Sequence, residues 1–512
     1  MSRELDFYQS QYDLLEKGSN SCVIYRVQQH IRDVSRYSYE PLVLSIGPYH
    51  HGSASLQRLE KYKWGYLDEV LKLNCKKSLR DYLMTINELA RETRMCYAED
   101  VNMNSEEFLQ MLLLDSCFIL VALGGSNMIL RCKQQETNEP GNNKEIIVDN
   151  QKELGNDETS TLNTESPGEN QKVETEVMED TQCQSGEGQW SIIFINHDLL
   201  LLENQIPFSV VQRLYDAICG EDSDPTLFPE EIAKFIEAAL RFYPIAVRES
   251  GRPKHFQHLL HLCHMYFRPT RKVHDDHHYL VAPWYLYKLL SFGCKYLKLG
   301  HHIEGNDHHQ RVDHIEDGLQ LNRWRRAVQY IEAGVQFMKR EFDNLDPHSL
   351  LDIKFSNGAL EIPCLFVDEY TEFLFRNLIA FEQTCPQFGD DFTAYIVFFS
   401  QLVSMPEDVV LLSKKEIIVH HLDSDAKVAD LLTMLSKDVV FDFNGNYYLK
   451  TLCQNLEQCY QSNLNRWMAW LWLNHFRNPW LALAALATAV VLICTVVQTI
   501  FGLLVYFDEA PT

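Results

Sequence analysis

The chain has 512 residues, 46% of them hydrophobic, which is enough for two or three domains or for one large helical body. Its formal net charge of −25 argues against nucleic acid as the main partner, because phosphate binding needs clustered Lys and Arg. The fourteen cysteines include no CxxC pair, so we expect free thiols in a reducing compartment rather than disulfides or a zinc site.

The first block of predicted structure spans residues 21–132. YEPLVLSIGPYHHG is typical of a short strand that ends in a Gly-Pro turn. Three helices are predicted after it, and the last, SEEFLQMLLLDSCFILVAL, begins with Ser105 as the expected N-cap. The first thirty residues of the chain contain no apolar segment of the kind found in a cleavable signal peptide.

An acidic insertion follows at residues 133–189. It contains fourteen acidic residues, four lysines and no aromatic residue, and so contributes −10 to the net charge. Such a composition cannot bury enough apolar surface to offset the entropy lost on ordering, so we predict a disordered loop. A functional acidic tail is the alternative interpretation.

The second block, residues 190–269, opens with HDLLLLENQIPF, where polar residues interrupt an apolar run. We predict one helix that Asn196 caps and that ends near Gln205, and a second with Pro207 at its first position. Glu203, Asn204 and Gln205 would then form a structural joint with Pro207, in which amide groups donate to the carbonyls that the break leaves free. The alternative is a catalytic site based on the Glu203 carboxylate.

Histidines recur every three residues in HFQHLLHLCHMYFRP, at His255, His258, His261 and His264. On one continuous helix they would spread over about 180°, and the i, i+4 spacing of helical zinc pairs is absent. We therefore expect a polar or partly packed helix face, with most of these histidines neutral near pH 7, rather than a metal site. The His-rich region at 270–317 offers weak zinc or nickel ligands, but a solvated loop is the preferred interpretation.

The third block, residues 318–478, opens with RWRRAVQYIEAGVQFMKRE, predicted to be a helix in which Ala333 and Gly334 allow close packing. Ser356-Asn357-Gly358 indicates the turn of a hairpin, and more helices follow. The arginines at the start of this block are expected to lie on a solvated or ion-pairing face, with lipid headgroup contact as the alternative.

Residues 480–507 form an uncharged run of 28 residues. As a helix it would reach roughly 42 Å, against about 30 Å of hydrocarbon, so we predict a transmembrane anchor. The basic flank precedes the run, which places the large body in the cytosol, with the plasma membrane as the expected location. The predicted flank consists of Arg466, Trp467, Trp470, Trp472, Arg477 and Trp480.

ENQIPF and SYEPLVLSIGPYHHG, together with MLLLDSCFIL, HLLHLCHMYFRP, MPEDVVLL and RWMAWLWLNHFRNPW, resemble the plant DUF247 family. The resemblance extends from about residue 21 to 504, and Gln28 departs from it where the family often has proline. It implies a mostly helical plant protein with one C-terminal membrane anchor. It supplies no catalytic residues, and some grass members determine pollen self-incompatibility.

Together these observations predict a mainly α fold: a large helical body with a few short strands or hairpins and one C-terminal transmembrane helix. We expect no catalytic residues, no cofactor and no bound metal. The expected partners are the bilayer, through residues 480–507, and another protein, without nucleic acid. The expected function is protein–protein recognition at a membrane, with self-incompatibility as one form of it, and the alternative is an enzyme that uses the clustered histidines as metal ligands.

The predicted organisation is a tail (1–20), block one (21–132), the acidic insertion (133–189), block two (190–269), the His-rich region (270–317), block three with its hairpin (318–478), the anchor (479–507) and a short tail (508–512).

Overall fold

The computed structural model describes residues 23–74, 76–124, 188–220, 224, 226–247, 251–270, 324–343, 347–462 and 479–508. The predictions for the N-terminal tail, for nearly all of the acidic insertion and for the His-rich region fall outside these residues. Within them the fold is mainly helical with a few short strands, as predicted.

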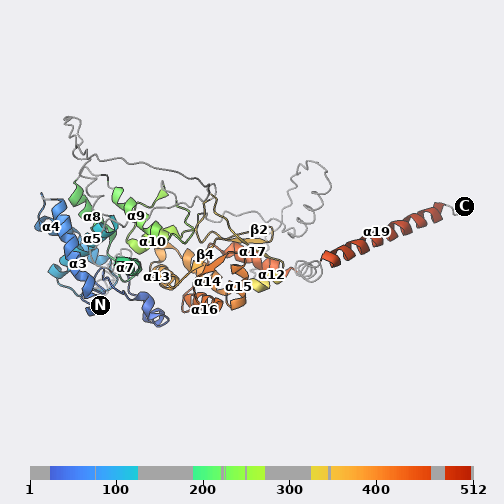
Figure 1. Cartoon of the computed structure of the whole chain (residues 1–512), viewed down its shortest axis with the longest axis horizontal. Coiled ribbons are helices and arrows are strands. Elements are labelled where there is room, and N and C mark those ends of the chain that lie inside the picture. The colour runs from blue at the N-terminus through green and yellow to red at the C-terminus, as the bar shows by residue number, and fades with distance from the viewer. Residues whose placement is uncertain are drawn as a thin grey trace, which may run out of the picture.

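A buried helix, α5 (Ser105–Gly124), forms the centre of the N-terminal half of the body (Figure 1). Every side chain from Met111 to Val121 is buried, so this part of the helix is enclosed on all sides, as expected for a core helix. Asn104 rather than the predicted Ser105 caps it, because the Asn104 Oδ1 accepts the Glu107 N–H at 2.8 Å. Four helices surround α5: α3 (Gln57–Leu73), α4 (Leu79–Met95), α8 (Phe208–Cys219) and α9 (Leu227–Ala239).

Among the described residues, α5 is the one single helix long and apolar enough to cross a membrane by composition. However, 67% of its most apolar window is buried inside the body, so α5 is accounted for as the core of a folded domain. A bent pair of helices, described next, also passes the test when taken together, with a 105° break.

That pair, α14 (Asp391–Leu402) and α15 (Pro406–Ser413), lies in the C-terminal half of the body (Figure 1). α14 is buried along most of its length, between α13 (Thr371–Thr384) and α16 (Asp425–Leu435). One continuous apolar core runs through both halves of the body. The remaining helical elements are α2 (Gln29–Arg32), η1 (Arg36–Tyr39), η2 (Ala54–Leu56), α7 (Gly188–Leu199), α10 (Leu259–Tyr266), α12 (Ala327–Glu332), η4 (Pro386–Phe388), α17 (Lys450–Gln461) and α19 (Pro479–Asp508).

The predicted hairpin is confirmed: β2 (Lys354–Ser356) pairs antiparallel with β3 (Ala359–Ile362). Asn357 and Gly358 form its turn at φ values of 52° and 77°, the left-handed conformation that Asn-Gly turns favour. The long helix predicted before the hairpin is wrong in its second half. Gly334, at φ 91°, ends α12, and the chain continues as β1 (Gln336–Lys339), parallel to β3. A second small sheet pairs β4 (Leu365–Val367) with β5 (Ile418–His420).

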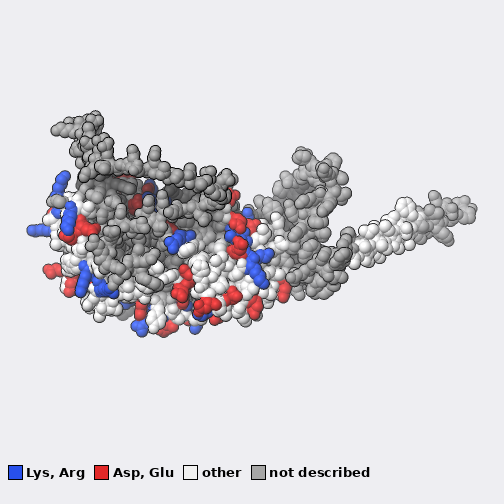
Figure 2. All heavy atoms as spheres, in the orientation of Figure 1, with Lys and Arg blue, Asp and Glu red and all other residues white. Residues whose placement is uncertain are grey.

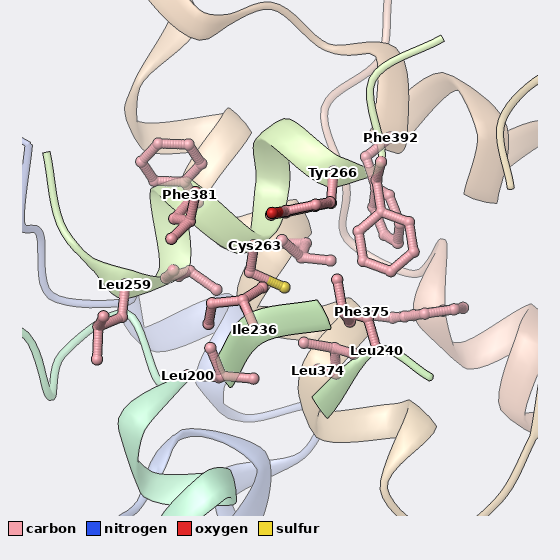
Figure 3. Packing of buried hydrophobic residues seen from close by; sticks show 14 of the residues in the cluster. Leu200, Ile236, Leu240, Leu259, Cys263, Tyr266, Leu374, Phe375, Phe381 and Phe392 are labelled. Carbon is pink, nitrogen blue, oxygen red and sulfur yellow. The ribbon is translucent and has the colours of Figure 1, made fainter. Parts of the chain in front are cut away.

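Helix α10 joins the two halves, because it packs against α9 on one side and against α13 on the other. Figure 3 shows this junction, where Ile236 of α9 and Leu240 directly after it meet Cys263 and Tyr266 of α10 and Phe375 and Phe381 of α13. A buried carboxylate reinforces it: Glu382 accepts the N–H groups of Phe392 and Thr393 at the start of α14, at 3.0 and 2.7 Å. Its Oε1 also lies 2.7 Å from the Nε2 of His264, so one side chain links α10, α13 and α14.

The four histidines were predicted to lie on a polar or partly packed face of one helix, and the structure shows a shorter helix with three of them packed in the core. Helix α10 begins only at Leu259, with His258 as its N-cap, and three of the four histidines are buried. The His258 Nδ1 accepts the His261 N–H at 3.2 Å, and its Nε2 lies 3.1 Å from the carbonyl oxygen of Val23. Burial lowers the pKa of His258 and of His261 to about 3, so both are neutral near pH 7.

Because His258 binds a proton less readily when folded than when unfolded, it destabilises the fold at acid pH. The contribution of neutral His258 to the unfolding free energy is fully present above the unfolded pKa of about 6.5. It is lost as the pH falls towards 3, and at pH 5 the loss amounts to roughly 2 kcal/mol. We expect His258→Asn, which keeps an N-cap acceptor but does not titrate, to flatten the dependence of unfolding free energy on pH between 6.5 and 4. Urea unfolding at several pH values measures this slope. The exposed His255→Asn is the matched control and should leave it unchanged, and an unaltered slope in His258→Asn would contradict the assignment.

Candidate functional site

The segment from Leu42 to Gly47 is irregular, with bends at Leu42 and Val43 and a φ of 76° at Gly47. It is not the predicted strand, because no strand in the described part of the chain pairs with it. Buried side chains bind its backbone instead. The Asp198 carboxylate accepts the N–H groups of Leu42, Val43 and Leu44 at 2.8, 2.7 and 2.7 Å. A carboxylate from a distant part of the chain therefore accepts the backbone N–H groups that a neighbouring strand would accept in a sheet.

The N–H groups of Ile46 and Gly47 are bound in the same way. The Asn204 Oδ1 accepts the Ile46 N–H, and the Asp115 Oδ2 accepts the Gly47 N–H, both at 2.7 Å. The Nδ2 of Asn204 donates in turn to the carbonyl of Leu44 at 3.0 Å. Side chains from α5, from α7 and from the joint after α7 thus hold one short piece of backbone.

A buried lysine completes this network. The Nζ of Lys63 donates to the Ser45 carbonyl at 2.5 Å and to the carboxylates of Asp115 and Glu60 at 2.6 Å each. Burial acts to lower the pKa of Lys63, but the two carboxylates outweigh it and raise the pKa above its ordinary value. The ammonium group stays charged because its opposite charges are buried with it.

The joint after α7 begins earlier than predicted. Helix α7 ends at Leu199 rather than near Gln205, and α8 begins at Phe208, with Pro207 one position before it. The amide Nε2 of Gln205 donates to the carbonyls of Leu199 and Leu201 at 2.7 and 2.8 Å. The Nδ2 of Asn204 donates to the carbonyl of Asp198 at 2.8 Å, so both amides bind carbonyls around the end of the helix.

Glu203 points the other way, towards the N-terminal segment. It is 1% exposed, and its Oε1 accepts the Val27 N–H at 2.7 Å and pairs with the Arg32 guanidinium. Its Oε2 has no hydrogen-bond partner in the described part of the chain and lies 3.6 Å from the Nε2 of His50, which is also unpartnered there. Such unpaired buried polar atoms are rare and favour a bound water or ligand.

These two side chains line an open cleft of about 520 Å³, a volume within the range of small-molecule sites. Its charged groups are paired around the rim: Arg26 with Glu99 at 2.8 Å, and Arg32 with Glu40 at 3.9 Å. Arg26 also lies over the Tyr49 ring, 4.5 Å from its centre. The lining residues are Arg26, Val27, Gln28, Gln29, Arg32, Glu40, His50, Glu99 and Glu203.

The cleft keeps His50 neutral. Desolvation first, and then the positive charges of Arg32 and Arg26, lower the pKa of His50 to about 4. At pH 7 its imidazole therefore offers one N–H donor and one lone pair. The cleft thus presents a buried carboxylate oxygen beside a neutral imidazole, a pair able to bind a hydrogen-bonding ligand or to move a proton.

The other predicted site residues lie elsewhere. Arg325 pairs with Glu457 at 3.2 Å and Arg326 with the buried Asp408 at 2.8 Å, so these arginines form ion pairs. Within the described ranges no three His, Cys, Asp or Glu side chains are grouped as metal ligands. The predicted membrane flank from Arg466 to Arg477 falls outside the described residues, and Trp480 lies in α19, where its side chain is not described.

Sequence reasoning missed several residues of this region. Asp198 stands in the same HDLLLLENQ run as the predicted joint, and Asp115 is the one acid within MLLLDSCFIL. A lone acid in an apolar run is the signal that would have identified both, since a buried carboxylate needs partners. No comparable signal marks His50 or Arg32, whose roles depend on distant contacts.

The family model that matches this chain is DUF247, described as a plant protein of unknown function, and it covers residues 24–494. UPF0481 protein At3g47200 of Arabidopsis thaliana is 26% identical, over 97% of this chain and 89% of its own length. Putative UPF0481 protein At3g02645 of the same plant is 23% identical, over 98% and 93%. No solved structure matches the chain.

The close approach of the two segments predicts a strict requirement for glycine at position 47. Gly47 has a φ of 76°, and a Cβ there would lie 2.4 Å from the carbonyl oxygen of Gln205. We expect Gly47→Ala to lower the unfolding free energy by more than about 2 kcal/mol, from left-handed strain plus displacement of the joint.

Gly52 provides the matched control, because it has nearly the same φ, 77°, but nothing within 4 Å of the added Cβ. Gly52→Ala should therefore cost only the backbone strain of about 1 kcal/mol. Chemical denaturation of both variants separates the two effects, and equal losses would show that the contact with Gln205 is unimportant.

Proposed function

The chain belongs to the DUF247 family of plant proteins, and we propose that it is a bilayer-anchored recognition protein whose folded body binds another protein. The observation that carries the proposal is α19, a helix of 30 residues that stands apart from the body in Figure 1. Its sequence is uncharged from residue 480 to 507. Figure 2 likewise shows charged side chains spread over the body and none along the described part of this helix.

The side chains described in α19 suit a lipid surrounding. Val491, Ile493 and Phe501 are each more than 60% exposed, an arrangement unfavourable in water. The hydroxyls of Thr488 and Thr495 donate to the carbonyls of Ala484 and Val491 at 2.8 Å each, so they need no water. The apolar stretch with described side chains, Val490–Phe501, is shorter than a bilayer, so the span depends on the whole run.

Protein recognition by the body is supported by exposed aromatic residues on α3. Tyr62 and Trp64 are about half exposed, at 49% and 51%, and Tyr and Trp are the residue types enriched where protein partners bind most tightly. The basic flank before α19 favours a cytosolic position for the body. We propose the plasma membrane as its location.

The alternative is an enzyme that uses the clustered histidines as metal ligands. Within α10 and its N-cap, His258, His261 and His264 each have their own hydrogen-bond partner and are buried in the core. This geometry favours structural roles for the three, so recognition is the better-supported proposal.

Self-incompatibility is the finer form of the proposal and depends on the family resemblance. If this protein determines self-recognition, disruption of its gene in a self-incompatible plant should allow self pollen tubes to grow through the style. Pollen tube counts after self-pollination and cross-pollination measure the effect. Continued rejection of self pollen would remove this role and leave the anchored recognition protein in place.

Removal of residues 479–512 should release the body from membranes into the soluble fraction. Carbonate extraction of membranes from cells that express the truncated and the full chain measures this. Deletion of residues 509–512 alone is the control and should leave the protein in the membrane pellet, because the apolar run is intact. A truncated body that still resists carbonate would overturn the anchor.

A further inference from the structure

We propose that the cleft between the N-terminal segment and the joint binds a neutral, hydroxyl-rich ligand such as a sugar or polyol, which hydrogen-bonds to Glu203 and His50. The inference concerns the body alone and does not depend on the membrane anchor. It begins from the Glu203 Oε2, which has no hydrogen-bond partner among the described residues and belongs to a side chain that is 1% exposed and lines the cleft.

The position of this oxygen is held by the fold. The other oxygen of Glu203 is engaged by the Val27 N–H and by Arg32, so the carboxylate cannot turn to satisfy Oε2. The His50 Nε2 lies 3.6 Å away, too far for a direct hydrogen bond. One ligand atom can contact both at ordinary distances, and a hydroxyl is suited to this because it donates one hydrogen and accepts another.

A cationic ligand fits the cleft less well than a hydroxyl. The positive charges of Arg26 and Arg32, with desolvation, already disfavour the protonated form of His50, and an ammonium group at the same place would experience the same field. Glu203, the buried carboxylate that faces His50, already has Arg32 as its ion-pair partner and so attracts an added cation less than an unpaired carboxylate would.

An anionic ligand also fits less well. The arginines that would bind a phosphate or carboxylate are already paired, Arg26 with Glu99 and Arg32 with Glu40 and Glu203. Three carboxylates against two guanidinium groups give the lining a net charge of about −1, which repels an anion.

The rim and the size of the cleft suit a neutral polyol. Gln28 adds an amide group with two donors and an acceptor beside the paired charges. The Nε2 of Gln29 already donates to the Asp33 carboxylate at 2.6 Å, which leaves its amide oxygen as an acceptor. A volume of about 520 Å³ accommodates a small ligand, and Val27 is the one purely apolar residue among the lining side chains, so an apolar ligand would leave most of them unpaired.

The test uses the purified full chain in an amine oxide detergent, because a detergent with a sugar headgroup would compete. Isothermal titration calorimetry with glucose, galactose, sucrose and myo-inositol as probes should detect at least one of them, with a dissociation constant of about 1 mM or tighter. Inorganic phosphate and methylammonium are the comparison probes and should bind more weakly.

His50→Ala should weaken polyol binding by about tenfold, as for the loss of one hydrogen bond. His51→Ala, at the exposed neighbouring position, is the matched control and should bind as the unaltered chain does. Thermal unfolding checks that the variants fold, and His50→Gln replaces His50→Ala if the smaller side chain destabilises the segment.

Three results would overturn the proposal. The first is no heat with any polyol, which would mean that the cleft holds solvent only. The second is polyol binding that His50→Ala and His50→Gln leave unchanged, which would place the ligand elsewhere. The third is tighter, His50-dependent binding of phosphate or methylammonium, which would assign the cleft to a charged ligand.

Discussion

The contact between the Asp198 carboxylate and the backbone from Leu42 to Leu44 is the interaction on which the N-terminal half of the body depends. A backbone segment that packs into the core must satisfy its N–H and C=O groups, and no strand among the described residues pairs with this one. One carboxylate accepts three successive N–H groups, and Asn204 and Asp115 accept those of Ile46 and Gly47. Hydrogen bonds to a charged acceptor are stronger than those between neutral backbone groups in a sheet. A single carboxylate can therefore take the place of a neighbouring strand as the acceptor for these N–H groups.

The same region shows how structural and binding roles can share one residue. Glu203 and Asn204 are neighbours in the chain but face opposite sides of the joint, towards Arg32 and towards the segment that contains Ile46. One oxygen of Glu203 is used by the fold, and the other lines the cleft. Its position is therefore fixed before any ligand arrives, which reduces the entropy lost on binding.

The accuracy of the sequence predictions follows the range of the interactions involved. The hairpin at Asn357-Gly358 was predictable because its turn depends on two adjacent residues. The strand from Leu42 was predicted wrongly because its pattern is that of a strand, while its hydrogen-bond partners lie more than 150 residues away. The helix across Gly334 was predicted wrongly because the apolar spacing after this residue fits a helix as well as a strand. The positive φ of Gly334 ends the helix, and a strand follows. For the cleft, the joint residues could be identified from local polarity, but the approach of His50 to Glu203 could not.

The distance along the chain between the Leu42 segment and Asp198 also bears on how this protein is made. The hydrogen bonds of Leu42, Val43 and Leu44 join residues separated by 156, 155 and 154 positions. At a translation rate of about 5–20 residues per second, the segment leaves the ribosome roughly 8 to 30 seconds before the carboxylate that will bind it. During that interval its apolar side chains and free amides are accessible to other chains. The nascent N-terminal half is therefore a natural client for chaperones until Asp198 has emerged.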